Sequence, residues 1–158
     1  MKRIGIIGAG RFGMSLAETL ANAGAEVILI DRNRPAMQSA SEFATALQGD
    51  ATQPHVLAEA GFGECDVVVV AIGSNIEASM MATANCKELG VTSVVAKATS
   101  ELHGKILRRI GADSVVYPTA TVPIVSRVQS RTTMSSTSSK SPTAIRSPRS
   151  TSPTARAA

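Results

Sequence analysis

Short runs of apolar, mostly β-branched residues alternate with segments of helical periodicity through the first 118 residues of the chain. The runs predict six strands, at residues 4–7, 27–30, 44–48, 66–72, 93–97 and 114–117, and the segments predict five helices, at 12–23, 35–43, 54–60, 75–89 and 100–110. Strands joined through helices run parallel, and right-handed crossovers place the helices on both faces of the sheet. The pattern therefore predicts a Rossmann-like, doubly wound α/β fold with a parallel sheet in the order 3-2-1-4-5-6.

A change of composition after Pro118 divides the chain in two. Residues 1–118 contain all 12 acidic residues and carry a net charge of −2, whereas residues 119–158 contain no acidic residue and carry a net charge of +6. Serine and threonine make up 18 of those last 40 residues, which leaves too little apolar surface to offset the entropy lost on ordering. We therefore expect one folded domain at 1–118 and a disordered tail at 119–158.

Candidate catalytic and metal-binding residues are few. The cysteines, Cys65 and Cys86, have neither a disulfide framework nor the paired spacing of a metal site, and we expect them to act as small apolar side chains. The histidines, His55 and His103, are expected at the surface or at a boundary, without a carboxylate partner. The sequence predicts no catalytic constellation and no metal site.

Nothing in the sequence predicts a membrane span or a secretory leader. The longest apolar run, residues 67–72, is far shorter than the roughly 18 residues that a membrane span requires. Lys2 and Arg3 precede an apolar run that Gly5 and Gly8 interrupt, unlike the apolar core of a signal peptide. We expect a cytosolic protein with no transmembrane segment of its own.

A glycine-rich turn links the first predicted strand to the first predicted helix, with the sequence Gly8-Ala9-Gly10-Arg11-Phe12-Gly13. In this dinucleotide-binding fingerprint Gly8 makes the tight turn, Gly10 lets a phosphate approach the backbone, and Gly13 lets the helix pack closely on the strand. The free N–H groups and the positive end of the helix dipole then favour an anion. The turn therefore predicts a site for the phosphates of a nucleotide.

Asp31 ends the second predicted strand, 18 residues after Gly13. A carboxylate at this place accepts hydrogen bonds from ribose hydroxyls and repels a 2′-phosphate, which favours NAD(H), ATP or ADP over NADP. Arg32 beside it weakens that preference. The alternative for Asp31 is a solvated strand end. Arg11 would clamp phosphate oxygens, and the alternative for it is a solvated arginine on the first helical turn.

Further candidates lie where other strands end, because ligands of open α/β sheets bind outside the carboxyl ends of the strands. The full predicted cofactor-binding set is Gly8, Gly10, Arg11, Phe12, Gly13, Asp31, Arg32, Asp50, Ala51, Thr52, Ile72, Gly73, Asn75 and Lys97. For Asp50 and Thr52, a turn with a helix cap is an equally good interpretation. Ser74 and Glu77 match a capping box for the helix that begins near Asn75.

Eight segments together form a pattern more specific than the glycines alone: 8–13, 15–17, 27–31, 49–52, 69–79, 87–90, 95–98 and 110–113. With them, residues 1–118 resemble the N-terminal nucleotide-binding domain of the regulatory subunits of Trk and Ktr potassium uptake systems, the TrkA-N type of RCK or KTN domain. The resemblance implies a cytosolic, non-catalytic gating subunit that binds NAD(H) or ATP/ADP. It implies assembly from homodimers into octameric rings, and docking on a membrane potassium channel or transporter at the inner face of the cell membrane.

The same resemblance assigns roles to single residues. It implies that Arg11 reaches a terminal phosphate across the subunit contact and that Asp50 and Thr52 lie near the adenine. Two features depart from the family: Thr119 stands where members carry an acidic residue linked to divalent-cation binding, and the Ser/Thr/Arg tail replaces a crossover helix and a second ligand-binding domain. Reading a GC-rich gene out of frame would produce such a change, so our hypothesis is that 119–158 is a frameshifted or truncated product. Such a chain would bind nucleotide yet assemble or gate poorly.

Two other functions fit parts of the sequence. An NAD-dependent dehydrogenase or reductase fragment lacking its substrate domain would share the fold, but Arg11 within the turn and the lack of a catalytic acid or base disfavour it. The basic tail would suit a nucleic-acid or anionic-membrane arm, but it has no aromatic residue for base stacking and the rest of the chain is acidic. We therefore expect no nucleic-acid partner.

Overall fold

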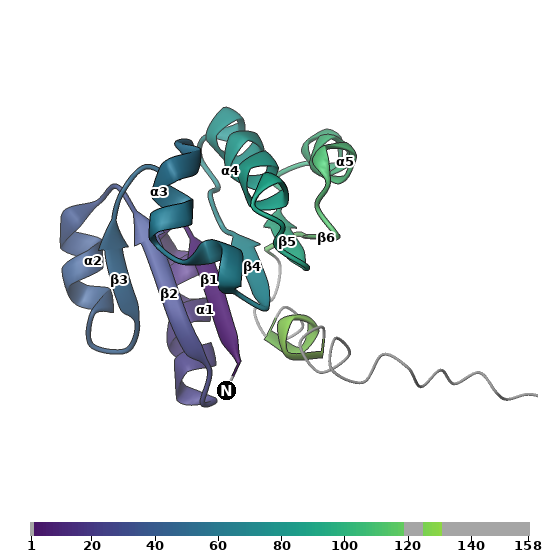
Figure 1. Cartoon of the computed structure of the whole chain (residues 1–158). Helices are drawn as coiled ribbons and strands as arrows, with labels where there is room; N and C mark the ends of the chain where they lie inside the picture. Colours follow the sequence, from purple (N-terminus) through teal and green to yellow (C-terminus); the bar gives the residue numbers. More distant parts are fainter. Residues whose placement is uncertain (1, 119–124, 131–158) are drawn as a thin grey trace, which may run out of the picture.

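Six parallel strands form one sheet in the order β3-β2-β1-β4-β5-β6, which confirms the predicted fold class and strand order (Figure 1). The computed structural model describes residues 2–118 and 125–130. The strands are β1 (Arg3–Ile7), β2 (Glu26–Asp31), β3 (Thr45–Gln48), β4 (Val67–Val70), β5 (Val94–Lys97) and β6 (Ser114–Val116). Because β1 pairs with β2 on one side and β4 on the other, the chain reverses its direction across the sheet there, and the carboxyl ends of β1 and β4 border a crevice.

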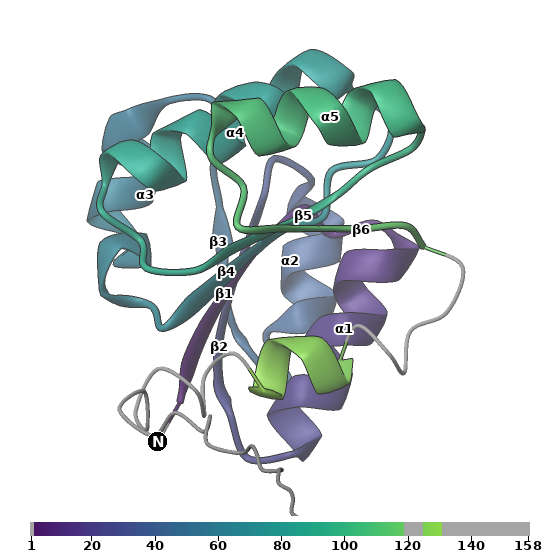
Figure 2. The same cartoon turned by 90° about the vertical axis from the view of Figure 1, so that its right-hand side faces the viewer.

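Five α-helices and one short 3-10 helix connect these strands. They are α1 (Arg11–Asn22), α2 (Arg34–Ala40), α3 (Pro54–Glu59), η1 (Phe62–Glu64), α4 (Ile76–Glu88) and α5 (Glu101–Ile110). Helices α1 and α2 cover one face of the sheet, and α3, α4 and α5 cover the other (Figure 2). The five predicted helices are all present with ends that differ by at most three residues, whereas η1 was not predicted.

Helix α4 begins one residue later than a cap at Ser74 would require. Asn75 has an extended backbone, and its Oδ1 accepts a hydrogen bond from the N–H of Ala78 at 2.9 Å. Asparagine is as good an N-cap as serine, and the residue that occupies the last extended position takes the role. The predicted capping box of Ser74 and Glu77 is therefore wrong.

Two apolar clusters lie between the sheet and its helices, one on each face. The cluster on the α3, α4 and α5 side includes Leu57, Phe62 and Leu107, and the cluster on the α1 and α2 side includes Leu16 and Leu20. All four valines of β4 are completely buried, and they alternate between the two clusters. A central strand covered on both faces must be apolar at every position, which is why β4 reads as a continuous valine run.

The prediction of a disordered tail is wrong for residues 125–130, which form a short helix that packs on the α1 side of the sheet (Figure 2). Val128 is fully buried in the cluster on that face, and Val125 packs against it. The three-residue spacing puts both valines on one side of the helix. The rest of the predicted tail, 119–124 and 131–158, lies outside the described residues, as does Thr119, so its disorder stays a prediction.

One close approach in the sheet depends on a missing side chain. A Cβ atom on Gly5 of β1 would lie 2.7 Å from Cε2 of Phe62 and 3.1 Å from Sγ of Cys65. Phe62 is completely buried, so its ring has little room to move. The glycine therefore lets η1 pack directly against the middle of β1.

We predict that Gly5→Ala lowers the free energy of unfolding by about 1–3 kcal/mol through overpacking, measured by urea denaturation. Gly63→Ala is the matched control, because a Cβ at Gly63 would meet its nearest neighbour, the carbonyl oxygen of Leu89, at an ordinary 3.6 Å. The double variant Gly5→Ala/Phe62→Leu should recover part of the loss. Equal urea midpoints for Gly5→Ala and Gly63→Ala would contradict this account of the packing.

Candidate functional site

Two adjoining cavities lie at the carboxyl ends of the strands. The first has a volume of about 510 Å³ and is lined by Ile7, Gly8, Ile30, Asp31, Arg32, Gly49, Asp50, Ala51, Thr52, Ile72, Ser74, Asn75, Glu77, Ala78 and Met81. The second has a volume of about 730 Å³ and is lined by Gly8, Ala9, Gly10, Arg11, Phe12, Ser15, Asp31, Asn33, Ala71, Gly73, Ser74, Lys97 and Pro118. Gly8, Asp31 and Ser74 line both, so the cavities adjoin at the glycine-rich turn.

The glycine-rich turn holds the helix end against the sheet. Gly8 has a positive φ of 107°, and its N–H donates to the carbonyl oxygen of Ile30 at 2.9 Å. A Cβ on Gly13 would collide with the carbonyl oxygen of Gly8, so no larger residue fits there without moving α1 away from β1. Gly10, in contrast, has open space where a Cβ would be. Gly8 and Gly13 thus make the turn, and Gly10 leaves its outer side accessible.

The amino end of α1 points into this space without a side-chain cap. Gly10 is the N-cap, and the first turn contains no acidic residue. Met14 donates its N–H to the carbonyl oxygen of Gly10 at 2.9 Å, and the N–H groups before it in the helix are available to an anion. Because α1 has 12 residues, its dipole adds a partial positive charge at the turn.

Asp31 joins the end of β2 to the turn. Its Oδ2 accepts a hydrogen bond from the N–H of Ala9 at 2.7 Å, and its Oδ1 accepts one from the N–H of Asn33 at 2.8 Å. Each carboxylate oxygen keeps a further lone pair that can accept from a ligand hydroxyl. The side chain therefore orders the glycine-rich turn and carries its negative charge where the two cavities meet.

Asp50 makes a local turn at the rim of the first cavity. Its Oδ1 accepts from both the hydroxyl of Thr52, at 2.7 Å, and the N–H of Thr52, at 3.0 Å. These bonds, led by the one from the hydroxyl, lower the pKa of Asp50. Arg32 approaches the other oxygen, with Nη1 4.0 Å from Oδ2. The turn interpretation thus accounts for the side-chain contacts of Asp50 and Thr52, while both residues also line the cavity with Ala51.

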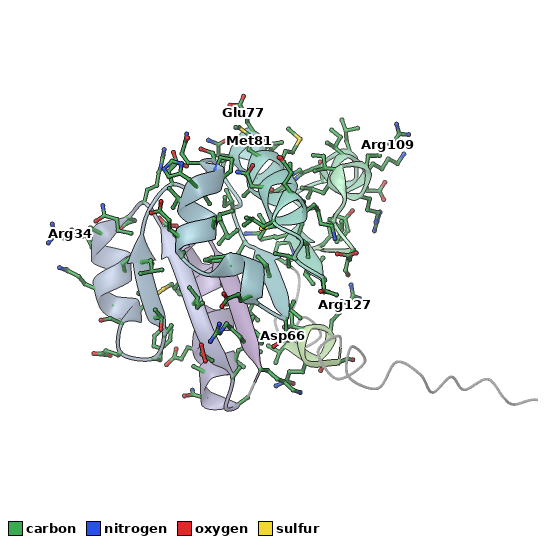
Figure 3. All side chains as sticks on the ribbon, in the orientation of Figure 1. Arg34, Asp66, Glu77, Met81, Arg109 and Arg127 are labelled. Atoms are coloured by element: carbon green, nitrogen blue, oxygen red, sulfur yellow. The ribbon has the colours of Figure 1, made fainter. Side chains whose placement is uncertain are left out.

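The opposite wall of the first cavity comes from the β4–α4 connection and the start of α4. Ile72 and Asn75 line it, although the Oδ1 of Asn75 is engaged in capping α4. Glu77 and Met81 lie one helical turn apart on α4 at this end of the molecule (Figure 3). Ala78 and Met81 were not among the predicted site residues, and Glu77 was assigned to a cap. Their three- and four-residue spacing on one helix face was the available signal.

The second cavity carries two of the three positive side chains that line the site. Arg11 and Lys97 both line it, and Nζ of Lys97 lies 5.2 Å from the centre of the Phe12 ring. The first cavity is acidic in comparison, with Asp31, Asp50 and Glu77 against Arg32 alone. The lining of the first cavity thus has an excess of carboxylates, whereas the second has two cations and shares Asp31 with the first.

The predicted cofactor-binding residues come together in these cavities, with one exception. Gly13 lines neither cavity, because it is buried where α1 packs on the turn. Ser15, Asn33 and Pro118 line the second cavity without having been predicted. They reach it from the second turn of α1 and from the segments that follow β2 and β6. Ser15 belongs to segment 15–17 of the family resemblance, whereas no sequence signal marked Asn33 or Pro118.

The titratable groups with the largest burial lie outside both cavities. Burial raises the pKa of Cys65 and of Cys86 to about 12, so both stay as apolar thiols. His103 is 2% exposed, which corrects the expectation that it lies at the surface or at a boundary. Among residues 2–118 and 125–130, no group of three or more His, Cys, Asp or Glu side chains is placed to hold a metal ion, and no helix is long and apolar enough to cross a membrane.

The sequence matches the TrkA-N domain over residues 4–118. The chain belongs to the TrkA-N family. This TrkA-N domain is 41% identical over 118 residues to the Ktr system potassium uptake protein C of Bacillus subtilis, covering 74% of the chain and 53% of that protein. The chain spans about half the length of the curated relatives it matches.

Solved structures share the fold of the TrkA-N domain. The structure of GsuK bound to ADP is 27% identical, with a TM-score of 0.64 over 82% of this chain and 33% of that one. The GsuK channel bound to NAD is 20% identical, with a TM-score of 0.64 over 73% of this chain and 21% of that one. At 20% identity, the similarity to the GsuK channel bound to NAD shows a shared fold only.

The buried position of His103 generates a prediction about pH. Its Nδ1 accepts a hydrogen bond from the N–H of Thr99 at 3.1 Å, and Nε2 is buried without a partner among the described residues. Desolvation lowers the pKa of His103, so the unfolded chain binds a proton more readily than the folded one. Stability should therefore be fully present above the unfolded pKa, about 6.5, and decrease as the pH falls below it.

We predict that His103→Gln flattens the pH dependence of the unfolding free energy between pH 7 and pH 5, measured by urea denaturation at several pH values. His55→Gln is the control, because His55 is exposed, and it should keep the slope of the wild type. A His103→Gln slope that matches the wild type would show that another group is responsible.

Proposed function

We propose that this TrkA-N domain binds an adenine nucleotide, NAD(H) or ATP/ADP, across the two cavities and serves as the nucleotide-sensing part of a potassium uptake regulatory subunit. The observation that carries the proposal is the junction of the cavities. There Asp31 and the uncapped end of α1 meet at the glycine-rich turn. A carboxylate for ribose hydroxyls beside free N–H groups for phosphate is the arrangement that a nucleotide needs.

The division of charge orients the ligand. The nucleoside would occupy the first cavity, where Asp31 accepts from ribose hydroxyls and Asp50, Ala51 and Thr52 border the base. The phosphates would lie on the turn at Gly8 and Gly10, and the distal part of the ligand would enter the second cavity beside Arg11. The negative wall would exclude a 2′-phosphate from the first cavity, because like charges repel strongly where water is partly excluded.

Regulation would follow from a difference in affinity between two conformations. A ligand shifts an equilibrium only as far as its binding free energies to the two states differ. We infer that the domain acts in a homo-oligomer, from a dimer to an octameric ring, at the cytoplasmic face of the membrane, together with a potassium channel or transporter subunit. The potassium uptake relatives support this assignment, and they favour a regulatory role over the dehydrogenase alternative.

We predict that Asp31→Asn weakens the binding of NADH and relieves the discrimination against NADPH. The ratio of the two dissociation constants should change by on the order of tenfold. Calorimetric titration of the full chain with each dinucleotide measures the ratio. Glu18→Gln is the control, since Glu18 is exposed on α1 and lines neither cavity. Wild-type protein that binds neither NADH nor ATP would refute nucleotide binding. Hydride exchange with an added carbonyl substrate, abolished in Asp31→Asn, would support the dehydrogenase instead.

Replacing Arg11 tests whether its side chain binds the outer phosphates of the nucleotide. We predict that Arg11→Ala weakens ATP binding by about tenfold and AMP binding much less, because a charge-assisted hydrogen bond to an outer phosphate is lost. Arg109→Ala is the matched control, as this arginine is exposed on α5 (Figure 3) and lines neither cavity. Equal weakening of AMP and ATP would instead place Arg11 at the first phosphate or in the packing of the turn.

A further inference from the structure

Lys97 is the last residue of β5 and lines the second cavity, and its ammonium group forms no ion pair with a carboxylate of the described residues. The ion pairs of those residues join Arg3, Arg32 and Lys87 to carboxylates, and Lys97 is in none of them. Its contact is the ring of Phe12, 5.2 Å from Nζ to the ring centre. A half-buried cation held by an aromatic face keeps its full charge available to a ligand.

Two neighbours set the position of this ammonium. Phe12 packs against the apolar cluster on the α1 side of the sheet, which holds its ring in place. Gly73, after β4, provides the space, because a Cβ there would lie 2.7 Å from Nζ and 3.4 Å from Cε of Lys97. Phe12 at the start of α1 and Gly73 after β4 thus both contact the ammonium group at the end of β5.

The contact with Phe12 is weaker than the contact that a phosphate would offer. A cation–π contact at a partly exposed site is weak, whereas hydrogen bonds between ionised groups are among the strongest hydrogen bonds in proteins. An ammonium group on a flexible four-carbon chain can turn from the ring to an anion in the same cavity. The Phe12 ring therefore orders the Lys97 side chain without neutralising its charge.

We propose that Lys97 is a specificity-determining residue that reads the number of phosphates on the bound nucleotide and favours di- and triphosphates over monophosphates. This rests on the proposed function. A single phosphate would remain at the glycine-rich turn, whereas further phosphates extend past it into the second cavity. Lys97 meets them there from the same protomer, independently of any subunit contact. Its effect therefore increases with each phosphate beyond the first.

The test compares AMP, ADP and ATP binding to the full chain by calorimetry at one fixed ionic strength. In Lys97→Gln, the ratio of the AMP to the ATP dissociation constant should fall by on the order of tenfold, with AMP itself nearly unchanged. Lys97→Met, which keeps an unbranched apolar chain against Phe12, should give the same result, and Lys97→Arg should retain the preference. Lys105→Gln is the matched control, because Lys105 is exposed on α5 and lines neither cavity.

The outcomes separate this proposal from the one on which it rests. If the wild type binds all three nucleotides and Lys97→Gln keeps its AMP-to-ATP ratio, Lys97 does not read the phosphates, although nucleotide binding stands. Equal weakening of AMP and ATP in Lys97→Gln also overturns the proposal, because the lysine would then act at the first phosphate or on the fold. A wild type that binds none of the three overturns both proposals.

Discussion

The site depends on the close approach of α1 to the end of β1. Gly13 faces the carbonyl oxygen of Gly8 so closely that a Cβ would collide with it, and this contact directs the uncapped end of α1 toward the crevice. Asp31 then accepts the N–H of Ala9 at 2.7 Å and fixes the turn to the end of β2. Both cavities lie around this junction, so a change that moves α1 would alter both together.

The division of charge around that junction connects the fold to the proposed function. Carboxylates border the first cavity, whereas Arg11 and Lys97 stand in the second. A neutral nucleoside with hydroxyl donors suits the first environment, and a chain of phosphates suits the second. A ligand that spans both would connect the segments after β1, β2, β3, β4 and β5. Such a ligand can couple its own length to the relative positions of these segments, which a regulatory domain requires.

The periodicity of the sequence was sufficient to predict the strands, the helices and the strand order, because a doubly covered parallel sheet requires apolar runs between helices. The local glycine motif was also sufficient to predict the tight turn at Gly8 and the close helix contact at Gly13. Prediction from sequence patterns failed where several side chains compete for one role, as when Asn75 rather than Ser74 capped α4. Such prediction also failed for His103, whose burial depends on the residues that α5 contacts.

The sequence by itself determined the fold class, the position of the glycine-rich turn and the acidic end of β2, since each follows from residues close together along the chain. Only the tertiary structure decided that Lys97 rests on Phe12 above Gly73, that Met81 completes the first cavity, and that Val128 is buried beneath the sheet. These contacts join segments far apart in sequence. Their existence depends on the packing distances between elements, which local periodicity does not encode.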